Sequence, residues 1–471
     1  MITEIIKFNT LLDKCRRLNI NYIKLNPLSM LSAARYTKLL TTLMDNGFEV
    51  INLTRDHGFE VTQAPRFAWE KFRRTYLKCD TIVYGAGSLW KLTTHPLKGT
   101  FSPKPKEVYL VKDTTLLVTR TGRINVSGLF LKEHNQLITE LLEVEHTAFT
   151  EDLLRVISND RKILKYVITF LNSSFGYDLS NIAWFGALQP HLDPKIIEKI
   201  PIPLAPISIR SKIVGLLTSA YELEIKAWRA YFKAMKIVKE YFDKTERSIT
   251  GIVRIRDIRN FPYFRVDPSR PLASDAVSRL VKEYSGRVRR ISDLFEVRTA
   301  GVPREKKYKI RKGQYPLITI DSIDESGIID YEKIYYMTRK GEPCPKGSIL
   351  LVKDGASIGK ASILPYDAYV MQGIATLVPK PNVDETLKYY VFALLKSSFY
   401  RRTIEALGYG ATVQYSITKD ELESLEIPIM EGLANEVSKH MKEFIEKMYD
   451  ADKLKMRAIS ELEGFILRLL G

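Results

Sequence analysis

The sequence predicts an α+β protein made of two similar modules, each followed by a long helix. Three observations predict it: segments that recur in the same order, short apolar runs broken by Gly and Pro, and two stretches with apolar residues at seven-residue spacing. Strands and helices do not alternate regularly within a module, so we expect a mixed or antiparallel, curved sheet in each.

Four matched features carry the repeat. TLLVTRTG and ILLVKDG are apolar strands that run into a polar turn, and each copy later has Ser-Ser-Phe, a Gln after a Gly, and a Pro-bearing strand. The matches pair Leu116 with Leu350, Phe175 with Phe399, Gln189 with Gln414 and Pro201 with Pro428. Two copies at an offset of roughly 225 residues indicate a duplicated module, not a solenoid. A duplicated module favours a target with two parts.

The charge indicates what kind of target. Lys and Arg total 72 against 55 acids, which gives a net charge of +17. Such an excess favours a polyanion, above all nucleic acid. General solubility and an anionic membrane surface are the alternatives, but the chain has no uninterrupted apolar run near the length of a membrane span. We therefore expect no membrane association. Hydrophobic residues make up 45% of the chain, enough to bury real cores.

Cysteine usage indicates a reducing compartment. Cys15, Cys79 and Cys344 are far apart and form no CxxC motif, so we expect free thiols and no metal site. The N-terminal residues lack the apolar core of a signal peptide. We expect a cytoplasmic protein.

Two segments are predicted to be helices of 35–40 residues that pair as an antiparallel coiled coil. The first has apolar or small residues at Ile213, Leu217, Ala220, Ala227, Tyr231, Ala234, Val238 and Tyr241. The second has them at Val437, Met441, Phe444, Met448, Ala451, Ala458, Leu462, Phe465 and Leu469. The alternative is two amphipathic helices, each lying on its own module. Each helix would be about 50–60 Å long, more than one small domain can cover.

Each apolar stripe is interrupted once, by Glu224 and by Lys455. Aligning the stripe midpoints antiparallel places these two residues across from each other. An opposite charge at a seam can fix register and offset desolvation. The alternative is that both side chains reach solvent.

These patterns divide the chain into six parts. Residues 1–75 have no counterpart later in the chain and are expected to pack with the first module. The further parts are a first module at 76–205, a spacer helix at 206–245, a connector at 246–290, a second module at 291–429 and a second spacer helix at 430–471.

The chain resembles the specificity subunit of type I restriction–modification systems. The resemblance is carried by Leu116–Gly122 with Leu350–Gly359, by Gly410–Gln414, and by Ile200–Val214, in duplicated order. It implies two target recognition domains that each read half of a split sequence in double-stranded DNA. It also implies that the coiled coil spaces them and docks DNA methyltransferase subunits, two of them, with restriction subunits as further partners. The implied subunit is non-catalytic and needs no cofactor.

Base reading requires side chains on a rigid scaffold, with cations near by to hold phosphates. The candidates in the second module are Arg298, Arg304, Lys306, Lys307, Lys353, Asp354, Ser357, Lys360, Arg401, Arg402, Gln414 and Tyr415. Those in the first are Thr119, Arg120, Arg123, Trp184, Gln189 and His191. The alternatives are a solvated basic face, plain turns at the glycines, local bonding of the Gln loop, and a core position for the Trp.

The sequence gives little support to the hypothesis that the chain is itself an enzyme. There is no D/N-P-P-[YF] loop for an amino-methyltransferase, no Walker loop and no convincing carboxylate cluster for a nuclease. A self-contained DNA-modifying enzyme and an orphan nucleic-acid-binding protein remain the alternatives.

Overall fold

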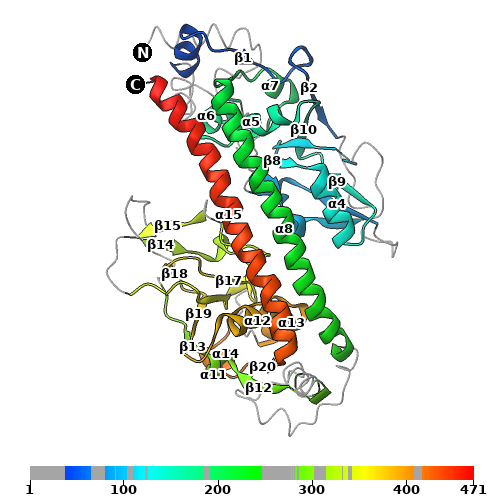
Figure 1. Cartoon of the computed structure of the whole chain (residues 1–471), viewed down its shortest axis with the longest axis vertical. Helices are drawn as coiled ribbons and strands as arrows, with labels where there is room; N and C mark the ends of the chain where they lie inside the picture. The colour runs from blue at the N-terminus through cyan, green and yellow to red at the C-terminus, as the bar shows by residue number, and fades with distance from the viewer. Residues whose placement is uncertain are drawn as a thin grey trace. The chain divides into compact units, whose positions relative to one another are not determined.

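The computed structural model describes residues 38–470 apart from 65–79, 91, 103–109, 112, 122–125, 184–190, 247–276, 278, 280–281, 284–285, 302–314, 331–332, 338–341 and 408–415. The chain forms two compact units. Unit 1 contains residues 1–226 and 447–471, and unit 2 contains residues 227–446. The mixed α/β architecture expected from the sequence is confirmed (Figure 1).

Unit 1 is built on a six-stranded sheet in the order β2-β10-β7-β8-β5-β4. Its strands are Phe59–Gln63, Leu153–Ser158, Thr115–Thr119, Ser127–Phe130, Leu92–Thr94 and Leu89–Trp90. A second sheet has the order β6-β3-β9 (Thr100–Ser102, Thr81–Tyr84, His146–Phe149), and β1 (Val50–Ile51) pairs with β11 (Ile202–Pro203). The helices are α4 (Lys132–Leu141), α5 (Arg161–Leu171), α6 (Ser174–Ala183), α7 (Pro194–Glu198) and the start of α8 (Ile207–Glu246).

Unit 2 has a four-stranded sheet in the order β13-β19-β16-β17 (Phe295–Arg298, Ile374–Pro379, Ile349–Val352, Ala361–Ile363). A three-stranded sheet has the order β15-β14-β18 (Tyr335–Met337, Tyr315–Ile318, Tyr369–Val370), and β12 (Arg287–Arg290) pairs with β20 (Glu426–Ile429). The helices are α11 (Ile291–Leu294), α12 (Glu385–Lys396), α13 (Ser398–Leu407), α14 (Lys419–Glu423) and the start of α15 (Glu431–Leu470).

The two units use the same strand order. The run β2-β10-β7-β8 in unit 1 corresponds to β13-β19-β16-β17 in unit 2, and each small sheet has one parallel and one antiparallel pair about its central strand. The helix that follows is capped alike, because Asp160 accepts from two backbone N–H groups of α5 and Asp384 accepts from one of α12. The duplication inferred from the sequence therefore extends to the topology.

The predicted match of Leu116 with Leu350 is wrong by one residue. Thr119 pairs with Leu153 at the start of β10, and Val352 pairs with Ile374 at the start of β19, so Leu117 is the counterpart of Leu350. Both strands are apolar at every central position and buried on both faces, so their sequence shows no alternation that fixes the register.

A tyrosine clamp corrects a second match. The Tyr166 hydroxyl donates to the Pro203 carbonyl at 2.7 Å, and the Tyr390 hydroxyl donates to the Pro428 carbonyl at 2.8 Å. Pro203, not Pro201, is therefore the counterpart of Pro428. The two prolines of the first copy lie two residues apart, and only the second accepts this hydrogen bond.

The expectation that residues 1–75 have no counterpart is wrong for residues 50–63. β1 pairs with β11 as β12 pairs with β20, and β2 pairs with β10 as β13 pairs with β19. β1 has only two residues, too few to show an alternating pattern in the sequence.

The two long helices are confirmed, each with 40 residues. Within unit 1, α8 contacts α15 through Lys212 and Glu461 at 2.6 Å and through the buried pair Glu224 and Lys455, so the two segments run antiparallel there. Within unit 2, Trp228 and Tyr231 of α8 pack on Phe444 of α15, and Figure 1 shows the helices side by side. The seam residues predicted up to Val238 and up to Leu462 are buried.

The Glu224–Lys455 contact is the ion pair predicted from the interrupted seams. The side chains are 1% and 3% exposed. The Thr93 hydroxyl of β5 donates to the same Glu224 oxygen at 3.3 Å, and the Lys455 ammonium lies 5.9 Å from the centre of the Tyr221 ring. The pair therefore also joins the helices to the sheet of unit 1. A role in fixing the helix register stays a prediction.

Candidate nucleic-acid interface

In each unit a basic residue directly follows the central strand and is held by its backbone. In unit 1 the N–H of Arg120 donates to the Asp152 carbonyl at 2.7 Å, and its carbonyl accepts from Leu192 at 2.9 Å. In unit 2 the N–H of Lys353 donates to the Gly373 carbonyl at 2.9 Å, and its carbonyl accepts from Ile417 at 3.0 Å. Arg120 and Lys353 are therefore structural counterparts at the ends of β7 and β16.

Directly after β16 in unit 2, two neighbouring residues form an ion pair. The Lys353 ammonium lies 3.0 Å from a carboxylate oxygen of Asp354, and the Ser416 hydroxyl donates to that same oxygen at 2.6 Å. Asp354 and Ser416 also form an isolated β-bridge. Gly355 follows with φ of 78°, a conformation that favours glycine, and Ser357 ends the short helix that begins there.

The strand end of unit 1 carries different side chains on the same backbone. Thr121 and His191 form the bridge that Asp354 and Ser416 form in unit 2. The Nε atom of Arg120 and the hydroxyl oxygen of Thr121 are buried without a hydrogen-bond partner. Thr119, the last residue of β7, is fully buried, so this position offers no surface for direct contact with DNA.

Several predicted phosphate contacts in unit 2 are already paired with acids. Lys360 and Arg401 both bind the Glu325 carboxylate at 3.0 Å, and Arg401 also binds Glu405 at 3.1 Å. Burial raises the pKa of Glu325, but the hydrogen bonds and charges of Lys360 and Arg401 outweigh it and hold the pKa below its usual value. Gly359 lets Arg401 approach, because a Cβ there would lie 3.3 Å from Arg401 Cγ. This cluster is therefore internally neutralised.

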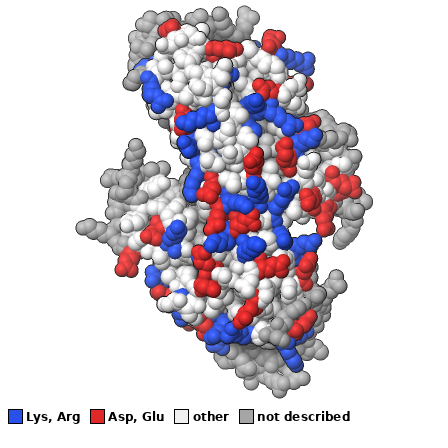
Figure 2. Space-filling model, viewed as in Figure 1, with Lys and Arg blue, Asp and Glu red and all other residues white. Residues whose placement is uncertain are grey.

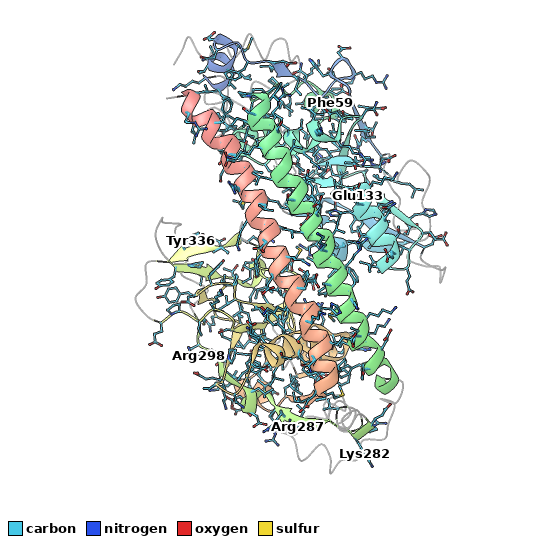
Figure 3. The ribbon with its side chains drawn as sticks, viewed as in Figure 1. Phe59, Glu133, Lys282, Arg287, Arg298 and Tyr336 are labelled. Atoms are coloured by element: carbon cyan, nitrogen blue, oxygen red, sulfur yellow. The ribbon has the colours of Figure 1, made fainter. Side chains whose placement is uncertain are left out.

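Arg298 and Arg402 are more accessible. Arg298 lies on β13, where Figure 3 labels it. It binds Glu296 two residues away with two hydrogen bonds of 2.8 and 3.0 Å, and the hydrogen bond to Glu296 raises the pKa of Arg298. Both of these side chains are exposed, so the pair stabilises little and can be exchanged for a phosphate. Arg402 is exposed and donates to the Ser398 carbonyl at 3.3 Å.

The structure adds candidates that sequence reasoning missed. All four residues of β12 (Arg287–Arg290) are exposed, and of its three arginines Arg287 pairs with Glu431 at 3.0 Å. Tyr315, Tyr335 and Tyr336 are exposed on the paired strands β14 and β15, and Figure 3 labels Tyr336. The signals were present as the clusters RVRR and YEKIYY. On the face in Figure 2, Lys and Arg are interspersed with Asp and Glu along α8 and α15.

Eight predicted residues lie outside the described part of the chain: Arg123, Trp184, Gln189, Arg304, Lys306, Lys307, Gln414 and Tyr415. Among the residues that the structure does describe, no group of three or more His, Cys, Asp or Glu side chains could hold a metal ion. No helix in that described part is long and apolar enough to span a membrane.

A family model matches part of the chain. Residues 286–462 match the family model of the type I restriction modification DNA specificity domain. No curated protein sequence matches the chain.

The solved structures that resemble the chain include the S subunit of a type I restriction-modification system from M. genitalium, with 13% identity over 90% of this chain and 96% of that one, at a TM-score of 0.41. The HsdS subunit from Thermoanaerobacter tengcongensis shows 12% identity over 86% and 96%, at a TM-score of 0.26. The type IIG restriction endonuclease BpuSI shows 8% identity over 41% and 28%, at a TM-score of 0.29. These TM-scores are low, so we rest the function on the family model and on this chain's own residues.

Proposed function

We infer that this chain, whose residues 286–462 carry a type I restriction modification DNA specificity domain, is the DNA-recognition subunit of a type I restriction–modification system. The family match is the observation that carries this inference, because it spans the second module and most of α15. The net charge of +17 supports a polyanionic partner.

We extend the inference to a target with two parts. Unit 1 repeats the strand order of unit 2, so the fold that reads DNA in the matched segment is present twice. Two modules related by a pseudo-twofold would read two half-sites. In this proposal α8 and α15 form an antiparallel coiled coil that sets the spacing between the half-sites, with Glu224 and Lys455 fixing its register.

The proposed partners supply the chemistry. The subunit itself is non-catalytic, works in the cytoplasm, and directs two methyltransferase subunits and the restriction subunits to their DNA. A test is to express the full chain with its own methyltransferase in a host that lacks DNA methylation. We expect methylated sites made of two short half-sites at a fixed spacing. A contiguous motif, or methylation by the chain without the methyltransferase, contradicts the proposal.

Two sets of substitutions separate affinity from specificity. Neutralising three cations together is expected to weaken binding to all sequences and to flatten its salt dependence, because fewer counterions are released. These are Arg304, Lys306 and Lys307. Changing Gln414 is expected to alter sequence preference, since a Gln can pair with adenine through two hydrogen bonds. Binding titrations at several salt concentrations measure both, and an unchanged salt slope after the triple change removes that stretch from the interface.

A further inference from the structure

The two strand ends share one backbone geometry but differ in whether their basic residue is already paired. In unit 2 the basic residue, Lys353, is followed by an acid, Asp354. In unit 1 the basic residue, Arg120, is followed by Thr121. We propose that Arg120 is a DNA phosphate contact of the first module, and that Asp354 keeps Lys353 in an internal ion pair so that the second module makes no such contact here. This rests on the proposed function and adds residues that determine how the modules differ.

In unit 2 the contacts of Lys353 and Asp354 keep the Lys353 ammonium paired. The Lys353 side chain is 13% exposed, and its ammonium lies 3.0 Å from Asp354. Asp354 is held in turn by the Ser416 hydroxyl, and a Cβ on Gly373 would lie 3.2 Å from its other oxygen. For Lys353 to reach a phosphate, it must leave a carboxylate that is itself fixed by hydrogen bonding. The exchange replaces one charged partner by another and releases little net free energy.

In unit 1, by contrast, the residues that the structure describes include no acidic partner that would neutralise Arg120. Nothing in the described part of the chain forms an ion pair with Arg120, although its backbone N–H donates to the carbonyl of an acidic residue, Asp152. Its Nε atom is buried without a hydrogen-bond partner, so the guanidinium is not fully hydrogen-bonded within the described part of the chain. A phosphate offers several acceptor oxygens, two of which the planar guanidinium can bind through parallel N–H groups.

The backbone of Arg120 is also pre-organised. Hydrogen bonds from its N–H to Asp152 and to its carbonyl from Leu192 fix the residue on both sides. No backbone ordering is therefore needed when this residue binds a ligand. The same argument applies to Lys353, so the neighbouring acid is the feature that separates the two positions.

The experiment exchanges the neighbouring residue between the units in the full chain, bound to its methyltransferase. The variants are Arg120→Ala, Thr121→Asp, Lys353→Ala and Asp354→Thr. Affinity for a duplex carrying the methylated site is titrated between 50 and 200 mM salt. We expect Arg120→Ala and Thr121→Asp each to lower the slope of log K against log salt by about 0.9, the value for one phosphate contact. The affinity deficit of Arg120→Ala should then shrink about 3.5-fold across this fourfold range of salt.

The unit 2 variants give the opposite result. Lys353→Ala should leave the slope unchanged, and Asp354→Thr should raise it by about 0.9, since the freed ammonium can bind a phosphate. Arg120→Lys, which keeps the charge, should keep the wild-type slope, so a loss in Arg120→Ala is assigned to charge and not to misfolding. Arg161→Ala is the matched control, because Arg161 is a half-exposed arginine of unit 1 that pairs with Glu133 at 3.5 Å.

The outcomes separate the two proposals. If the wild-type complex binds no duplex specifically, the proposed function fails. If it binds specifically and the slopes of Arg120→Ala and Thr121→Asp equal that of the wild type, the role of Arg120 is wrong. If Lys353→Ala lowers the slope as much as Arg120→Ala does, the shielding by Asp354 is wrong.

Discussion

Reversing the charge of Glu224 tests the ion pair that joins the two long helices in unit 1. The Glu224 and Lys455 side chains are 1% and 3% exposed, so neither can turn to solvent without disrupting the packing. Glu224→Lys places two ammonium groups together beside the Thr93 hydroxyl and the Tyr221 ring. Removing one partner of a buried pair costs about 3–5 kcal/mol, and a like charge adds repulsion. This is a large fraction of the stability of a typical domain, about 5–15 kcal/mol.

The double variant Glu224→Lys with Lys455→Glu restores opposite charges at the same two positions, and we expect it to recover most of the lost stability. Urea unfolding, with hydrogen exchange to assign each transition to unit 1 or unit 2, measures the change. The reversed pair Lys212→Glu with Glu461→Lys is the control, because those side chains are 47% and 24% exposed and should contribute little. The reasoning is refuted if Glu224→Lys costs less than about 1 kcal/mol, or if the double variant is no more stable than the single one.

Three further predictions concern stability. Burial, and secondly the charge of Lys455, lower the pKa of His134 to about 4. Between pH 6.5 and 4 the unfolded chain therefore binds a proton that the folded chain does not, and unit 1 should lose up to about 3 kcal/mol of stability over this range. Unfolding titrations at several pH values measure this loss, and His134→Leu should remove it. Tyr166→Phe leaves the Pro203 carbonyl without this partner and should destabilise unit 1 by about 1–3 kcal/mol, and hydrogen exchange should show unit 2 unchanged. In Gly327→Ala the new Cβ would lie 2.7 Å from the Ala361 carbonyl oxygen, at a φ of 90°. Gly355 has a similar φ of 78° but open space around its Cβ, so Gly327→Ala should lower the melting temperature much more than Gly355→Ala does. Equal shifts in melting temperature contradict the packing argument.

The sequence predicted features that depend on order and spacing. The duplication follows from segments that recur in the same order, and the two long helices and the meeting of Glu224 with Lys455 follow from residue spacing along each helix. Register could not be predicted in the same way, because Leu116–Val118 and Ile349–Val352 are apolar throughout and a one-residue shift leaves the pattern unchanged. β1 was missed because two residues carry no periodic signal.

The candidate site shows the same limit. The basic residues at the strand ends could be named from the sequence, and both lie at the predicted turns. Which of them is neutralised depends on contacts across long sequence separations, such as Ser416 with Asp354 and Glu325 with Arg401. A spacing argument contains no information about such pairs, so all these cations were equal candidates before the structure was known.

The discontinuity of unit 1 has a consequence for the order in which the newborn chain acquires structure. Lys455 and the core residues Ala458, Leu462 and Ile466 belong to unit 1, yet a ribosome adds them after all of unit 2. The 220 residues of unit 2 are contiguous and are complete before them. Domains usually fold in the order of synthesis, but unit 1 can complete its core only after the second half of α15 has been made. Until then Glu224 has no counter-ion, so the core of unit 1 is completed only after unit 2 has been made.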